Sequence, residues 1–140
     1  MIENLKKINW IDNVTDKNIL IEAEFDKNNI IDILKILKDE YNFNQLLDIT
    51  AVDYPSREFR FDLIYILQSL KKNKKILLKK FLKEADSIFS VTNIHKAANW
   101  YERECYDLFG IEFLNHPDLR RIMTDYNFEG YPLRKDFPLT

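Results

Sequence analysis

WYERECYDLFG, at residues 100–110, is the stretch around which the rest of this 140-residue chain is organised. Its apolar positions, continued back to residue 94, recur at helical spacing and predict an amphipathic helix. Ser90 or Thr92 can cap the start with a side-chain oxygen, and Gly110 suits the end because a positive φ costs glycine little. The apolar stripe comprises Ile94, Ala97, Ala98, Tyr101, Cys105 and Leu108. We expect this stripe to face the protein core.

The charged residues of the same helix are expected on the flank away from this stripe. They are Glu102, Arg103, Glu104 and Asp107. A solvated polar flank is one interpretation. The mixture of charge with bulky aromatic side chains favours a second, a docking surface, because Arg, Trp and Tyr are enriched at the centres of protein interfaces.

A longer pattern includes this helix and resembles the signature of one protein family. Glu102, Arg103 and Glu104 precede Asp-Leu-Phe at 107–109, and the stretches HPDLRRIMTDY (116–126) and FEGYPLRKDFPL (128–139) follow. The family is the 30 kDa subunit of respiratory NADH:quinone oxidoreductase (complex I), designated by the letter C in bacteria and by the number 9 when it is encoded in mitochondria. Related subunits of membrane-bound hydrogenases carry looser versions of the pattern.

The resemblance implies a structural subunit that holds the neighbouring 49 kDa-type subunit and lies near iron–sulfur subunits. Electrons would pass from NADH through FMN and iron–sulfur clusters in those partners to a quinone such as ubiquinone, coupled to proton translocation. The chain would lie peripherally on the inner membrane through the complex, on the mitochondrial matrix face or the bacterial cytoplasmic face. We expect nine interface or tail-anchoring residues: Glu102, Arg103, Glu104, Asp107, His116, Arg120, Arg121, Arg134 and Lys135.

Two alternatives remain open at this point. The chain could be the equivalent subunit of a membrane-bound hydrogenase-type complex. It could also be a stand-alone nucleic-acid-binding module, because residues 71–83 contain seven lysines and no acid. Since the loop interleaves no arginine or aromatic residue, we favour a solvated hairpin whose lysines protect a sheet edge, and we expect no nucleic-acid partner.

The residue inventory argues against chemistry within this chain. One cysteine and two histidines cannot supply a four-ligand thiolate or imidazole metal site. Cys105 lies on the predicted apolar stripe, which indicates an inert buried thiol. Gly110 and Gly130 are twenty residues apart and cannot form a glycine-rich phosphate loop. We therefore expect no catalytic residue, cofactor site or metal ligand here.

Composition places the chain among ordinary globular proteins. It has 46% hydrophobic residues, 31% charged residues and a formal net charge of −2, enough apolar material for one domain with its own core. No apolar run approaches the roughly 20 residues that a membrane-spanning helix requires. The N-terminal sequence is expected to be neither a secretory signal nor a transit peptide.

Periodicity along the chain predicts a β-α-β-β-β-α order. Strands are expected at residues 19–25, 46–52, 59–67, 76–82 and, briefly, 87–91, with helices at 2–10, 29–41 and 94–109. A polar turn is expected at 13–17. These elements predict an α+β fold, a mixed β-sheet with helices packed on one face, followed by an extended irregular C-terminal tail. We expect an α+β domain at 1–110 and a partner-docking tail at 111–140.

Overall fold

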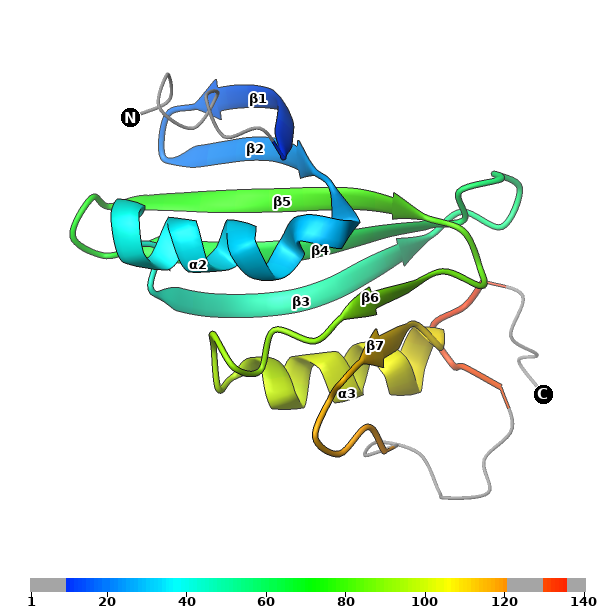
Figure 1. Ribbon diagram of the computed structural model, residues 1–140. Coiled ribbons are helices and arrows are strands. Elements are labelled where there is room, and N and C mark those ends of the chain that lie inside the picture. The colour runs from blue at the N-terminus through cyan, green and yellow to red at the C-terminus, as the bar shows by residue number, and fades with distance from the viewer. Residues whose placement is uncertain (1–9, 121–129, 136–140) are drawn as a thin grey trace.

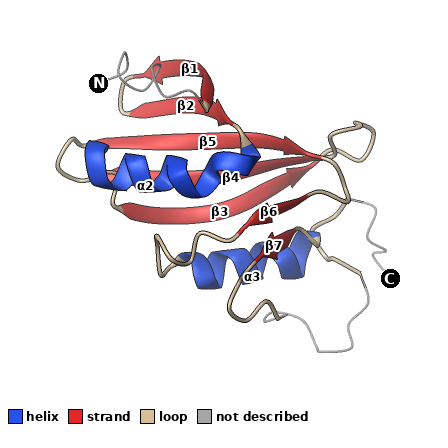
Figure 2. Ribbon diagram, in the orientation of Figure 1, coloured by secondary structure: helices blue, strands red, loops and turns tan. Residues whose placement is uncertain are grey.

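A computed structural model describes residues 10–120 and 130–135. The expected helix at 2–10 falls largely, and Arg121 wholly, outside the described residues. The elements follow one another as β1 (Ile11–Lys17), β2 (Leu20–Phe25), the short 3₁₀ helix η1 (Lys27–Asn29), α2 (Ile30–Tyr41), β3 (Gln45–Asp53), β4 (Phe61–Ser69), β5 (Lys74–Leu82), β6 (Ser87–Phe89), α3 (Ala98–Phe109) and β7 (Glu112–Leu114). The predicted α+β class is confirmed (Figures 1 and 2).

Five strands form one mixed sheet in the order β1-β2-β5-β4-β3. Strands β2 and β5 are parallel, and the other neighbours are antiparallel. The predicted strand at 76–82 does pair back on the strand before it, with Tyr65 opposite Leu78. Because β5 also pairs with β2, it lies inside the sheet, so the expectation that its lysines protect a sheet edge is wrong.

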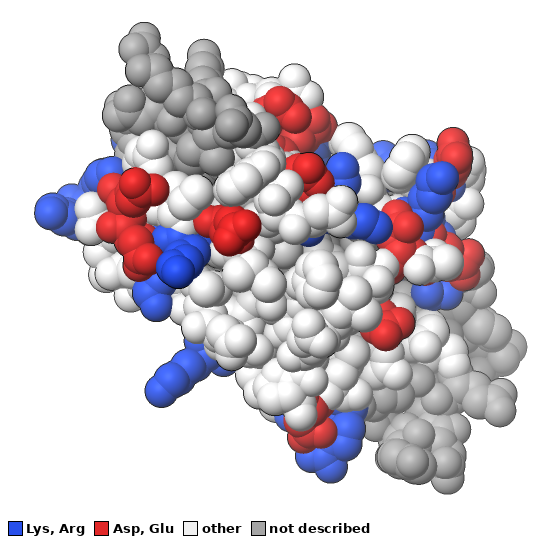
Figure 3. Space-filling model, in the orientation of Figure 1, with Lys and Arg blue, Asp and Glu red and all other residues white. Residues whose placement is uncertain are grey.

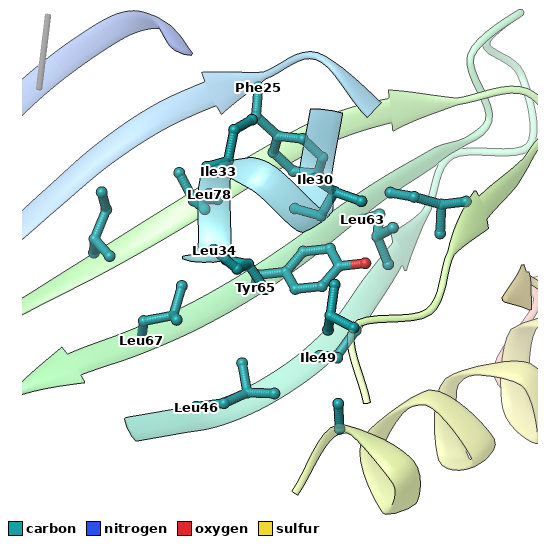
Figure 4. Packing of buried hydrophobic residues seen from close by; sticks show 14 of the residues in the cluster. Phe25, Ile30, Ile33, Leu34, Leu46, Ile49, Leu63, Tyr65, Leu67 and Leu78 are labelled. Atoms are coloured by element: carbon teal, nitrogen blue, oxygen red, sulfur yellow. The ribbon is translucent and has the colours of Figure 1, made fainter. Parts of the chain in front are cut away.

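Helix α2 covers one face of the sheet and closes the core (Figure 1). Its buried side chains, at positions spaced three and four apart, pack toward Tyr65 and Phe25 from the strands (Figure 4). The rings of those two aromatics meet edge to face with centroids 5.6 Å apart. Asn42 ends the helix with a left-handed backbone, φ 63°. The helix buries Ile30, Ile33, Leu34 and Leu37 completely.

Helix α3 lies beyond edge strand β3, next to the small parallel pair β6–β7 (Figure 1). Gly110 ends it with φ 78°, as the sequence predicted. The predicted cap at its start is wrong, because the helix begins at Ala98 after Ala97 and has no side-chain cap. Ser90 lies too early in the chain and instead bonds to a side chain of the helix.

Two stretches that the sequence analysis placed outside regular structure are strands. The predicted turn at 13–17 is part of β1, since a bulge between Asp12 and Thr15, with Asn13 at φ 51°, accommodates its polar residues beside β2. The turn instead falls at Asn18, φ 73°. Residues 112–114, expected in the irregular tail, form β7 and pair with β6. The ordered fold therefore continues past Gly110.

Candidate functional site

Glu102, in the middle of α3, is fully buried and does not lie on a solvated flank. One carboxylate oxygen accepts a hydrogen bond from Ser90 Oγ at 2.6 Å, and the other accepts one from the backbone N–H of Val91 at 2.9 Å. Burial raises its pKa to about 7, although both hydrogen bonds act to lower it. The carboxyl group therefore ties α3 to the chain that follows β6.

His116 fixes the segment after β7 to the same helix. Its Nδ1 accepts a hydrogen bond from the backbone N–H of Asp118 at 2.9 Å, so the ring proton is on Nε2 and is donated to the Asn99 carbonyl at 3.1 Å. Nε2 also lies 3.9 Å from a carboxylate oxygen of Glu102. Both ring nitrogens are thus used in holding the chain together.

A buried polar region lies between α3 and the sheet. Besides Glu102 it includes the Cys105 thiol, whose pKa is raised by burial and further by nearby carboxylates including Asp48. It also includes Tyr65, whose pKa is raised well above its ordinary value by burial and by Glu102. The Tyr65 hydroxyl is buried without a hydrogen-bond partner among the described residues. A thiol that stays protonated here is no activated nucleophile.

The outward side of α3 carries Arg103 and Glu104, which were expected at an interface, beside Trp100, which was not among the nine predicted residues. Trp100 is 52% exposed, whereas Arg103 and Glu104 are partly exposed. Arg103 Nε donates to the Arg120 carbonyl at 3.3 Å, and Arg120 pairs with Asp118 at 2.7 Å. Of the four charged helix residues, Asp107 is fully buried like Glu102, so the prediction of one charged flank is wrong for these two. The helix therefore presents Trp100, Arg103 and Glu104.

A second cluster joins the C-terminal segment 130–135 to the sheet. Arg60 and Asp53 form a buried bidentate pair, with Nε–Oδ1 and Nη2–Oδ2 distances of 2.6 and 2.9 Å. The backbone N–H of Lys135 donates to the same carboxylate at 2.7 Å. Burial raises the pKa of Asp53, but its bonds to Arg60 and Lys135 outweigh burial and leave that pKa below its ordinary value.

Arg134 attaches the segment to the end of α3. Its Nε donates to the Phe109 carbonyl at 2.6 Å, and its Nη1 lies 3.0 Å from a carboxylate oxygen of Glu84. Its guanidinium lies 4.7 Å from the centroid of the Tyr131 ring. Gly110 leaves room for this arrangement, because a Cβ there would lie 2.7 Å from the Tyr131 ring and 2.8 Å from Arg134 Nη2.

The sequence alone did not predict a role for Asp53, Arg60 or Glu84. Asp53 ends β3 and Arg60 precedes β4, so antiparallel pairing of these strands brings the two together. One sequence signal could have indicated this pair: an aspartate and an arginine stand at the two ends of the loop between two expected strands. The eight predicted residues that the structure describes fall into two groups: Arg134 and Lys135 in the segment 130–135, and Glu102, Arg103, Glu104, Asp107, His116 and Arg120 on or beside α3.

Within residues 10–120 and 130–135, no three or more His, Cys, Asp or Glu side chains are grouped so as to hold a metal ion. None of the helices in the described part of the chain is both long enough and apolar enough to cross a membrane. Charged side chains lie mainly around the margins of the face that carries α2, and other residues occupy its centre (Figure 3).

Comparison with known proteins identifies similar chains. The NADH-quinone oxidoreductase subunit designated C from Ruegeria pomeroyi is 52% identical over 114 residues, 80% of this chain and 57% of that protein. The NADH-ubiquinone oxidoreductase subunit 9 from Reclinomonas americana is 53% identical over 114 residues, 80% of this chain and 56% of that one. The chain thus spans little more than half the length of these curated relatives.

Two solved structures are also similar. A trypsin-resistant fragment (1-134) of Nqo5 matches with a TM-score of 0.71 and 29% identity, over 84% of this chain and 95% of that one. A chain of the membrane-bound sulfane sulfur reductase, an archaeal respiratory membrane complex, matches with a TM-score of 0.81 and 28% identity, over 98% and 82%. The family described as respiratory-chain NADH dehydrogenase, 30 kDa subunit, matches residues 23–140. The chain belongs to this 30 kDa subunit family.

Proposed function

We propose that this chain is a structural subunit in the hydrophilic arm of an NADH:quinone oxidoreductase. It docks the 49 kDa-type subunit and neighbouring iron–sulfur subunits, and so supports electron transfer from NADH to quinone that is coupled to proton translocation. FMN and iron–sulfur clusters belong to the partner subunits, and the oxidoreductase activity belongs to the assembly. The chain reaches the membrane only through the complex.

One observation carries this proposal: the C-terminal segment 130–135 is attached to the end of α3 by internal bonds, yet it presents apolar surface outward. Arg134 and Lys135 hold the backbone, whereas Leu133 is 52% exposed. Trp100 on α3 is exposed to the same degree. Large apolar side chains held outward on a rigid support are typical of interface anchors.

A second candidate is the corresponding subunit of a related membrane-bound complex, such as the hydrogenase-type complex considered above or another respiratory membrane complex. The similarity to the sulfane sulfur reductase chain favours it, because that match extends over nearly all of this chain. The higher identity to the NADH-quinone oxidoreductase relatives, about half of the aligned residues, favours the first proposal. Activity of the purified complex with NADH and a quinone would distinguish the two.

The test is complex assembly with the variants Trp100→Ala, Arg103→Ala and Arg134→Glu. We expect each to lower the amount of assembled complex while the isolated chain, checked by circular dichroism, stays folded. Trp100→Ala is expected to have the most direct effect. As an interface hot spot, Trp100 would contribute enough that its truncation weakens binding to the partner by about tenfold or more. The matched control is Leu70→Ala, which removes another exposed apolar side chain, 65% exposed, from the turn between β4 and β5. Unchanged assembly in all three variants would contradict the proposal.

A further inference from the structure

A separate surface lies at the end of the sheet where the β3–β4 loop meets the end of β5. We call it the aromatic–cation patch and define it as Tyr54, Arg57, Phe59, Phe81 and Lys83. Tyr54 is 37% exposed and Phe59 43% exposed, and Phe81 is partly exposed. The loop projects beyond the strands in Figure 1. Three aromatic rings gathered at one surface site indicate a contact surface.

Cations hold these rings in fixed positions. The Arg57 guanidinium lies 4.0 Å from the Tyr54 ring centroid and 5.5 Å from that of Phe81. Lys83 Nζ lies 5.3 Å from the Phe59 centroid. Arg57 itself is held by Asp62 at 2.5 Å and by the Phe59 carbonyl at 3.1 Å. The patch is therefore ordered before any partner arrives, which lowers the entropy that binding would cost.

The patch surrounds a hollow of about 320 Å³ that opens to solvent. Arg57, Glu58, Phe59 and Phe81 line it, and its wall is chiefly apolar. Small-molecule sites usually have volumes of roughly 300–1,000 Å³ and bury most of their ligand. This hollow is open and at the small end of that range, so it is better suited to a side chain inserted from a partner.

Around the hollow, positively charged side chains outnumber negatively charged ones. Four cationic side chains, of Arg57, Lys79, Lys83 and Lys135, lie over rings of this surface, with Lys79 Nζ 5.8 Å from the Phe81 centroid and Lys135 Nζ 5.6 Å from that of Tyr54. Two carboxylates, Asp62 and Glu58, pair with Arg57 and Lys83. The excess of positive charge favours a partner that carries carboxylates.

Phe81, which lines the hollow, also belongs to a partly apolar strip on the sheet face away from α2. Alternation along β4 and β5 places Ile64, Ile66, Leu77 and Phe81 on that face, with Ile66 directly opposite Leu77. All four are partly exposed, whereas Leu63 and Leu78, which point to the α2 side, are fully buried. A segment whose apolar side chain fills the hollow can thus extend along an apolar surface.

We propose that the aromatic–cation patch is a second docking site, which receives a polypeptide segment of another subunit. That segment inserts one apolar side chain into the hollow and places flanking carboxylates beside Lys79, Lys83 and Lys135. The inference rests on the proposed function in one respect, that the chain belongs to a multi-subunit assembly. The patch lies apart from Trp100 on α3, although Lys135 of the segment 130–135 borders both this patch and the first docking surface.

Site-specific photo-crosslinking in the assembled complex tests this directly. Phe59→p-benzoylphenylalanine places the probe at the hollow, and Trp100→p-benzoylphenylalanine places the same probe on α3. We expect the probe at position 59 to crosslink to a peptide of another subunit that has an Asp or Glu close to an apolar residue. In parallel, Phe59→Ala and Lys83→Glu should each weaken retention of the chain in the complex by about tenfold, whereas Leu70→Ala should not.

The outcomes separate the two proposals. A crosslink from position 100 but none from position 59 would overturn the second site and leave the first proposal standing. Crosslinks from position 59 to residues 136–140 of the same chain, to a second copy of it, or to lipid or nucleic acid would also overturn the second site. So would retention of the Phe59→Ala and Lys83→Glu variants equal to that of Leu70→Ala.

Discussion

Helices α2 and α3 each have twelve residues, but they are held in the fold by different forces. Helix α2 buries four aliphatic side chains and packs over the sheet. Helix α3 buries two carboxylates, Glu102 and Asp107, together with small or aromatic residues. Burial of an aliphatic side chain stabilises wherever the surroundings are apolar, whereas a buried carboxylate needs donors in particular places. Periodicity predicts both helices, but the packing of α3 also depends on donors that reach its buried Glu102, namely Ser90 and the Val91 backbone.

The largest expected effect tests the apolar side of this comparison. Leu34→Ala removes a fully buried side chain from α2 and leaves a cavity against Tyr65 and its neighbours. We expect a loss of about 2–5 kcal/mol in the free energy of unfolding, nearly independent of pH. Chemical denaturation of the isolated chain at pH 5 and pH 8 measures it. The exposed neighbour variant Lys35→Ala is the control, and a strongly pH-dependent loss would contradict the packing account.

The polar side of the comparison is tested by Glu102→Gln. The folded-state pKa of Glu102, about 7, is above its ordinary value of 4.5, so the folded protein binds this proton more tightly than the unfolded chain does. The contribution of Glu102 to the free energy of unfolding is therefore fully present below about pH 4.5 and is lost as pH rises through about 7. Its size is roughly 1.4 kcal/mol for each unit by which the pKa is raised.

Glutamine mimics the protonated carboxyl group, so Glu102→Gln should remove this part of the pH dependence. The measurement is the difference in unfolding free energy between variant and wild type from pH 4 to pH 8. His95, whose pKa is lowered by burial and by Lys38, affects both proteins alike and cancels in the difference. A difference that does not change with pH would contradict the prediction, because it would mean that the pKa of Glu102 is the same in the folded and unfolded chain.

The smallest expected effect concerns the end of α3. Gly110→Ala introduces a side chain at φ 78°, which costs about 1–2 kcal/mol, and places a Cβ against Tyr131 and Arg134. We expect a modest loss of stability together with release of the segment 130–135. Proteolysis at Lys135 followed by mass spectrometry would detect the release. Asn42→Ala, at the left-handed end of α2, is the matched control and should leave that cleavage unchanged.

Much of the fold could be predicted because its signals are local. The alternation of apolar residues in β2 and β4 and the stripe in α2 follow from the geometry of strand and helix. The hairpin formed by β4 and β5 and the end of α3 at Gly110 were predicted for the same reason. The bulged strand β1 and the short strand β7 were missed, since their residues pair only when β2 and β6 supply partners.

The interface residues were predicted less completely than the fold. Family resemblance indicated Arg134 and Lys135, but not the buried pair of Asp53 and Arg60 to which Lys135 attaches. It also indicated Glu102 without its role, because the donors Ser90 and Val91 lie twelve and eleven residues away across a loop. The interface roles of the nine predicted residues stay predictions for the assembly experiments above.

The sequence by itself determined most of the segments that become helices and strands, where two of them end, and to which family the chain is similar. These properties depend on side-chain periodicity and on the backbone freedom of single residues, both of which are local. Only the tertiary structure decided which charges are buried, which strands run parallel, and how 130–135 joins the sheet. A charged side chain is buried only where other parts of the chain supply hydrogen-bond donors to it. Because those donors are distant in sequence, no local sequence pattern predicts which charges are buried.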